Sequence, residues 1–322
     1  MFSLNKIKTF SVLFLCFVLR ALESAPLSPW LCDEIEAIST IQATQKPMII
    51  AFLGDGWCPW SNKFAQEILD KPEFFEALKK DAVLLHVPLK QNMSTHLQEL
   101  LHVDRPATLL ITDSNGEEIG RFGFLPIAPK DYARRILHLI RCFNEIKAFM
   151  DSPPLQYDEE AYQLIYRKSQ KLSTPFYKKK IIQMGIEKGN SSFFLLEKYC
   201  TLLEVLSPKH VLVKSLRQEI LKKEPEMQLD LAMIEFQKLG AAVRLGEDLK
   251  TSIEPLLAYV KQFGGKNKEG VSRAEIAMAQ YLFMKNDTDG ALIHAEKAYA
   301  AGAGRVKAEA KSLISHLKAL KQ

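Results

Sequence analysis

The stretch that decides the fold is residues 46–64, which read Lys-Pro-Met-Ile-Ile-Ala-Phe-Leu-Gly-Asp-Gly-Trp-Cys-Pro-Trp-Ser-Asn-Lys-Phe. The first half is a short apolar run of the kind that forms a buried strand. The second half leads through a glycine-containing turn into a predicted helix from Asn62 to Leu69. A buried strand that passes directly into a helix is typical of a sheet covered by helices.

Cys58 lies at the turn between this strand and this helix. The free N–H groups and the positive dipole end of a helix N-terminus favour a thiolate, which is the reactive form of cysteine. Pro59 in the first helical turn loses no hydrogen bond. Trp57 and Trp60 flank the sulfur and offer apolar contact to a partner. We therefore expect Cys58 to be a nucleophile, rather than an inert buried thiol.

The residues around this stretch predict further strands and helices in the N-terminal part. Two more buried strands are expected at 82–89 and 107–112, and Asp113-Ser-Asn-Gly116 is a hairpin turn signal that leads into a returning strand at 117–124. Helical patterns occupy the remaining segments, at 29–45, 72–80, 94–101 and 129–150. The fold class predicted is α/β, with a mixed sheet of at least four strands flanked by helices.

The segment from about Cys32 to Arg141 resembles thioredoxin-like proteins. The resemblance is closest to an exported branch that carries Trp-Cys-x-x-Cys after a Lys-Pro strand opening, and it extends to Arg105-Pro-Ala-Thr-Leu-Leu-Ile-Thr112. It implies a cis proline at Pro106 that faces Cys58. It also implies that Arg105 offers its backbone to an extended substrate chain, so that Pro106 joins Cys58 at the site.

Two positions depart from that family pattern. Ser61 stands where the second cysteine is expected, and a hydroxyl cannot attack a mixed disulfide from within. Phe52 stands where thioredoxin has a buried aspartate that handles protons, and Asp55 is expected on the nearby loop. The motif therefore predicts a monothiol site. Its mixed disulfide would be resolved by a thiol of the substrate, by glutathione or by another protein cysteine.

Three other cysteines are possible internal resolvers: Cys32 on the first helix, Cys142 on the helix at 129–150, and Cys200 in the C-terminal half. For each of them, a buried small apolar residue is the favoured interpretation. Their spacing does not suit a zinc site, and the histidines show no metal pairing with cysteine. We expect neither a metal nor a cofactor. His86 is interpreted as a packed or surface residue.

The C-terminal half contains helical patterns alone, separated by short breaks. Residues 273–304 resemble a tetratricopeptide repeat, with small residues at Ala279, Ala291 and Ala298, although the usual tryptophan and closing proline are missing. A generic helical bundle is the alternative. The predicted domains are a signal peptide at 1–24, a thioredoxin-like domain at 25–150 and an all-α, repeat-like domain at 151–322.

The leader and the composition set the expected surroundings. Residues 1–25 combine a basic start, about ten apolar residues and a small-residue exit, as in a secretory signal peptide. The expected location is an exported compartment, periplasmic or secreted, with membrane attachment only if the leader stays uncleaved. The 322 residues carry 43 basic and 38 acidic side chains, so the charge of +5 gives no reason to expect a nucleic-acid partner.

Two hypotheses of function follow. The first is an exported thiol-disulfide exchange enzyme, isomerase-like or forming mixed disulfides with cysteine-containing client proteins. In it Cys58 attacks, Ser61 and Pro106 complete the catalytic site, and Trp57, Pro59, Trp60 and Arg105 contact the substrate. The second is a redox-inactive binding protein that keeps the fold and acts through a protein partner of its helical domain.

Overall fold

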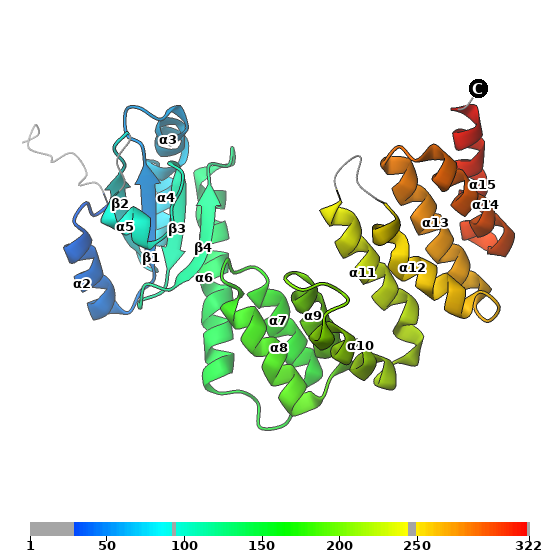
Figure 1. The fold of residues 1–322 in the computed structure, drawn as a ribbon. Coiled ribbons are helices and arrows are strands. Elements are labelled where there is room, and N and C mark those ends of the chain that lie inside the picture. Colours follow the sequence, from blue (N-terminus) through cyan, green and yellow to red (C-terminus); the bar gives the residue numbers. More distant parts are fainter. Residues whose placement is uncertain (1–28, 92–94, 244–248, 321–322) are drawn as a thin grey trace, which may run out of the picture. The chain divides into compact units, whose positions relative to one another are not determined.

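The computed structural model describes residues 29–91, 95–243 and 249–320. Contacts divide the chain into two compact units (Figure 1). The first holds the described residues up to Leu155 together with Gln163–Lys178, and the second holds Gln156–Tyr162 and the described residues from Lys179 onward. The domain limits expected at 25–150 and 151–322 stay a prediction. The leader at 1–24 lies outside the described residues.

The first unit is built on a four-stranded mixed sheet in the order β2-β1-β3-β4. β1 pairs in parallel with β2 and antiparallel with β3, and β3 pairs antiparallel with β4. The strands are β1 (Met48–Leu53), β2 (Val83–Pro88), β3 (Thr108–Thr112) and β4 (Glu118–Gly123). The mixed sheet and the positions of its strands confirm the predicted fold class.

Helices cover both faces of this sheet. On one face, α2 (Glu34–Thr44) and α5 (His96–Leu100) pack apolar residues against the even-numbered side chains of β1, including Phe52. On the other face lie α3 (Pro59–Phe64), its π-helical continuation η1 (Ala65–Leu69), α4 (Pro72–Leu78) and α6 (Pro129–Asp151). Tyr132 of α6 lies at the centre of an aromatic cluster there, with Phe64, Phe74 and Phe122.

The first helix begins later than the sequence pattern predicted. Asp33 is its N-cap, and the carboxylate of Asp33 accepts hydrogen bonds from two N–H groups of the first turn. Residues before the cap extend along the sheet instead, where Leu31 forms a bridge with Leu85 of β2. Cys32 is therefore not on a helix. Its side chain is exposed, so the prediction that it is a buried apolar residue was wrong.

The segment Gln163–Lys178 covers the free edge of the sheet at β4. The N–H of Ser173 donates to the carbonyl of Ile119 at 3.1 Å, and the Ser173 hydroxyl accepts from the N–H of Arg121 at 3.1 Å. Nearby, the ring of Tyr177 packs edge-on against Phe143 of α6. Such a cover satisfies backbone groups that an edge strand otherwise leaves unpaired.

The described residues after β4 form helices and no strand, as predicted. Two of these helices, α7 (Glu159–Ser169) and α8 (Pro175–Gly189), contain residues of both units. They are followed by α9 (Ser192–Leu203), α10 (Val211–Lys223), η2 (Pro225–Met227), α11 (Gln228–Ala242), α12 (Lys250–Phe263), α13 (Lys268–Met284), α14 (Thr288–Ala301) and α15 (Gly304–Ala319). The small residues expected at a helix crossing, Ala279, Ala291 and Ala298, are buried where α13 packs against α14. Membership of a repeat family stays a prediction.

Charged groups are buried among the helices of the second unit. Glu235 of α11 accepts hydrogen bonds from the Tyr199 hydroxyl of α9 and, at 3.1 Å, from Arg217 Nε of α10. His294 Nδ1 of α14 lies 2.6 Å from Glu275 Oε2 of α13. Within the described ranges, no helix combines the length and the hydrophobicity needed to cross a bilayer.

Candidate active site

Cys58 is the N-cap of α3, at the end of a tight turn that follows β1. The N–H of Cys58 donates to the carbonyl of Gly54 at 2.9 Å, and the Cys58 carbonyl accepts from the N–H of Asn62 at 3.0 Å. The helix begins at Pro59, three residues before the predicted start at Asn62, because proline is well placed in a first turn. The position predicted for Cys58, at a helix N-terminus, is confirmed.

The turn has this shape because of its two glycines and two side-chain hydrogen bonds. A Cβ at Gly54 would lie 2.7 Å from the Trp57 ring and 2.8 Å from the Cys58 Cβ, so this position admits no side chain without displacement. Gly56 has a φ of 76°, which favours glycine. The N–H of Gly56 donates to Asn62 Oδ1 at 3.1 Å, and Trp57 Nε1 donates to the carbonyl of Leu89 at 2.8 Å.

Ser61 is buried one helical turn after Cys58. Its hydroxyl oxygen accepts a hydrogen bond from the N–H of Gly54 at 2.9 Å, and the hydroxyl also hydrogen-bonds the Cys58 sulfur. Burial raises the pKa of Cys58, whereas hydrogen bonds from the Ser61 hydroxyl and from the N–H groups of Ser61 and Trp60 lower it. The net effect is a Cys58 pKa below the ordinary cysteine value, which favours a thiolate.

The surface around the sulfur is aromatic. Trp57 is 39% exposed and Trp60 is 62% exposed, whereas Cys58 itself is 8% exposed, so access to the sulfur is narrow. The Trp60 ring lies 6.1 Å from that of Phe124, and Lys63 Nζ lies 5.2 Å from the centre of the Phe124 ring. A rim of large exposed rings suits contact with an apolar segment of a protein substrate.

Arg105 and Pro106 lie at the same end of the sheet as Cys58. Because Thr108 of β3 pairs with Phe52 of β1, the loop before β3 lies beside the end of β1, from which the Cys58 turn begins. Arg105 is exposed, and its carbonyl accepts a hydrogen bond from the Thr108 hydroxyl at 2.9 Å.

The cis peptide bond implied for Pro106 is not found. The bond between Arg105 and Pro106 is trans, and Ala107 has a φ of 60°. The chain therefore bends into β3 at Ala107 through a left-handed backbone conformation. The prediction of a cis proline was wrong, and the role predicted for Pro106 at the site stays a prediction.

A second polar group lies near the turn, on the opposite face of the sheet from Phe52. Phe52 is fully buried in the apolar core beneath α2 and α5. On the other face, His86 Nε2 of β2 lies 3.1 Å from Asp55 Oδ2 of the turn. The sequence placed Asp55 on the loop correctly. The pairing of Asp55 with His86 was missed because the two residues are 31 positions apart and no local pattern joins them.

The remaining cysteines lie outside this arrangement. Cys142 is buried, as predicted, and its sulfur lies 3.7 Å from His138 Nε2, which is also 2.8 Å from Lys171 Nζ. The four-residue spacing between His138 and Cys142 on one helix is the signal that predicts this contact. Cys200 is partly exposed. Among the described residues, no cluster of three or more histidine, cysteine or acidic side chains could hold a metal ion.

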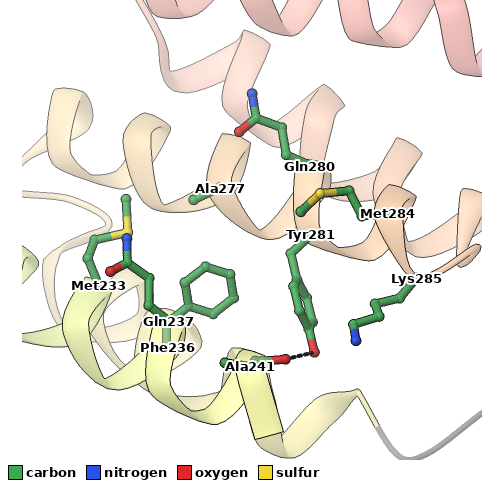
Figure 2. A pocket seen from close by; sticks show the side chains of 10 residues that line it. Met233, Phe236, Gln237, Ala241, Ala277, Gln280, Tyr281, Met284 and Lys285 are labelled. Atoms are coloured by element: carbon green, nitrogen blue, oxygen red, sulfur yellow. Dashed lines mark hydrogen bonds between the residues drawn. The ribbon is translucent and has the colours of Figure 1, made fainter. Parts of the chain in front are cut away.

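A cavity lies in the second unit, between α11 and α13. It has a volume of about 780 Å³, and Figure 2 shows Phe236, Tyr281 and two methionines among the residues that line it. The Tyr281 hydroxyl donates to the carbonyl of Gly240 at 3.4 Å. No cysteine, histidine or carboxylate lines this cavity.

Comparisons with known proteins find similarity to thioredoxin-like proteins. Residues 35–133 match the model of a thioredoxin-like domain. The chain is 25% identical to the thioredoxin-related protein DsbJ of Chlamydia pneumoniae over 338 positions, which cover 98% of this chain and 96% of that protein. A solved DsbH oxidoreductase is 21% identical; the match covers 37% of this chain and 91% of that chain, with a TM-score of 0.32.

Proposed function

From the thioredoxin-like domain over residues 35–133, we propose that this chain is a thiol-disulfide exchange protein that uses Cys58 as a lone nucleophile. The observation that carries the proposal is the hydrogen bond between the buried Ser61 hydroxyl and the Cys58 sulfur. A thiolate that accepts this bond is stabilised relative to the thiol. Because this position holds a serine, the motif lacks the second cysteine sulfur that a dithiol enzyme uses.

The first step is the attack of the Cys58 thiolate on a disulfide of a client protein. A new S–S bond joins Cys58 to one client sulfur, while the client S–S bond breaks and its second sulfur leaves as a thiolate that takes up a proton. A thiol of the client then attacks the mixed disulfide and loses its proton. Cys58 leaves as a thiolate, and the client regains a disulfide in a new pairing without net oxidation or reduction.

An isomerase-like role follows from this balance. Because Ser61 supplies no sulfur, the thiol that releases Cys58 comes from outside the motif, and a client with several cysteines supplies it. Trp57, Pro59 and Trp60 provide the surface that such a client contacts, with Arg105 and Pro106 at the same end of the sheet. The leader motif supports work in an exported compartment, where disulfides form. A protein partner for the helical unit stays a prediction.

The test is to trap mixed disulfides in the producing cells. Free thiols are blocked at the moment of lysis, and non-reducing gels are compared for the wild type and for Cys58→Ala. We expect thiol-sensitive adducts with client proteins in the wild type and none in Cys58→Ala. Cys142→Ala and Cys32→Ala serve as matched controls that keep the adducts.

The result also separates the two hypotheses of function. If Cys58→Ala leaves the same adducts, or if the wild type forms none and its Cys58 resists alkylation in the folded state, the exchange function is wrong. A redox-inactive binding role would then be the better account of the chain. A Ser61→Cys variant adds a positive readout, because it is expected to gain dithiol reductase activity on a generic disulfide.

A further inference from the structure

One cavity of the first unit lies beside α2 and α5, on the face of the sheet that carries Phe52. It has a volume of about 670 Å³, and sites for small molecules commonly have this size. Thr112, the last residue of β3, lines the cavity and pairs with Met48, the first residue of β1. The Cys58 turn follows the other end of β1, so the cavity is separate from the candidate active site.

Most of the lining of this cavity is apolar. The apolar side chains come from three elements: Ile38 and Ile41 of α2, Met48 and Ile50 of β1, and Leu97 and Leu100 of α5. Ile38 is 42% exposed and Leu100 is 62% exposed, so the apolar surface continues from the interior to the mouth. Covering such surface with an apolar ligand is favourable in proportion to the area removed from water.

The polar side chains that line the cavity are uncharged. They are Gln42, Gln45, Thr112, Ser114 and Asn115. No described residue in the lining carries a charge. A charged group of a ligand would lose hydration here without gaining an opposite charge, which is costly. The lining therefore favours a neutral ligand.

The Thr112 hydroxyl independently points to a ligand. Thr112 is 1% exposed, and its Oγ1 has no hydrogen-bond partner among the described residues. Its side chain lies on the same face of the sheet as that of Leu110, because side chains alternate along a strand, and this is the face of the cavity. A buried hydroxyl without a partner lowers stability, and valine, of similar shape, would avoid that cost. A ligand that bonds the hydroxyl accounts for threonine at this position.

We propose that this cavity binds a neutral, single-chain amphiphile, a molecule with an alkyl chain and one uncharged hydroxyl or carbonyl group. The alkyl chain lies along the apolar side chains of α2 and α5, and the polar group hydrogen-bonds Thr112 Oγ1. Because Thr112 is buried, only a group that enters the cavity reaches its hydroxyl. A slender molecule does so, whereas a helix of a partner protein laid across the mouth does not.

The test compares ligands that share one alkyl chain and differ in their head groups. 1-Decanol, decanoate and decylammonium are each titrated into the full-length chain near neutral pH by isothermal titration calorimetry. We expect 1-decanol to bind, and the two ions to bind more weakly by roughly tenfold or more. Shortening the chain to 1-octanol should weaken binding by roughly tenfold, because less apolar surface is buried.

A pair of variants on α2 locates the binding. Ile38→Gln replaces an apolar side chain of the lining and is expected to weaken 1-decanol binding by roughly fivefold or more. Ile35→Gln is the matched control, because Ile35 is 77% exposed on the same helix and does not line the cavity. It should leave the affinity within about twofold of the wild type.

Thr112→Val separates a ligand-binding role from a structural one. Losing one hydrogen bond is expected to weaken 1-decanol binding by roughly threefold to tenfold. The same substitution removes an unpaired buried hydroxyl, so the urea midpoint of the ligand-free protein should rise. A hydroxyl that served the fold would instead lower the midpoint when it is removed.

Three results would overturn the proposal: no binding of 1-decanol, equal binding of decanoate, or equal affinities in Ile38→Gln and Ile35→Gln. The last result would also arise if the alcohol bound in the cavity between α11 and α13. If circular dichroism shows that Ile38→Gln misfolds, Leu100→Gln at the opposite side of the mouth takes its place. The alkylation rate of Cys58 should be the same in every variant, so a failure here leaves the exchange function standing.

Discussion

Ser61 is the residue that most changes the chemistry of this site. It fills the place of a second sulfur with a hydroxyl that bonds both the Gly54 N–H and the Cys58 sulfur. The substitution therefore removes internal resolution while keeping the thiolate stabilised. A serine that merely filled space would need neither bond.

The first prediction concerns Ser61→Ala. Losing the hydroxyl removes the leading contribution that lowers the Cys58 pKa, while the burial that raises it remains. We expect the curve of Cys58 alkylation rate against pH to move to higher pH. The control Ser39→Ala removes an exposed hydroxyl on α2 that bonds the carbonyl of Ile35, and it should leave the curve in place. An unchanged curve in Ser61→Ala would contradict the assignment.

The same shift makes stability depend on pH. Because the pKa of Cys58 is lower in the folded protein than in the unfolded chain, its thiolate stabilises the fold above the unfolded value, and this stabilisation disappears as the pH falls through the folded value. The wild type should therefore lose stability relative to Cys58→Ala across that window as the pH falls. Denaturant unfolding at a series of pH values measures the difference.

A second prediction concerns Gly54, where a Cβ would overlap both the Trp57 ring and the Cys58 Cβ. Gly54→Ala is expected to lower the free energy of unfolding by about 1 to 3 kcal/mol, as overpacking does, and to alter the alkylation rate of Cys58. Gly123→Ala is the matched control, because nothing lies within 4 Å of its added Cβ. Equal effects of the two substitutions would show that the turn is less closely packed than described.

At the scale of elements, the second unit joins three helices through the carboxylate of Glu235. Glu235→Ala would leave the partly exposed Arg217 without its carboxylate partner and the buried Tyr199 hydroxyl without its acceptor. We expect a loss of about 1 to 3 kcal/mol, the cost of buried polar groups left unpaired. Thermal unfolding followed by circular dichroism measures it. Glu226→Ala, at an exposed position in η2, should cost little, and a similarly small effect at Glu235 would count against the network.

Elements were predicted well where local sequence decides them. The apolar run of β1, the Asn-Gly turn before β4 and the proline at the start of α3 each act through neighbouring residues. The start of the first helix was missed because a distant strand holds Leu31 in an extended conformation. The backbone at Pro106 was inferred from a family pattern, and the contacts of Asp55 and Ser61 depend on folding. Such contacts leave no periodic signal in the sequence.

At the scale of the whole molecule, the segment Gln163–Lys178 supports the sheet of the first unit. A fragment of residues 29–178 is expected to be more stable than one of residues 29–155 by about 2 to 4 kcal/mol, from the hydrogen bonds of Ser173 and the packing of Tyr177 on Phe143. Urea unfolding of the two fragments measures the difference. Equal stability would place the end of an independent domain near the predicted residue 150.

All three tryptophans of the chain, Trp30, Trp57 and Trp60, belong to the first unit, and two of them adjoin Cys58. Intrinsic tryptophan fluorescence therefore reports on unfolding of the sheet and of the surroundings of Cys58. It does not report on unfolding of the C-terminal helices. Far-ultraviolet ellipticity, by contrast, is dominated by those helices. Recording both signals during one denaturation would show whether the two halves unfold together or in sequence, without any added label.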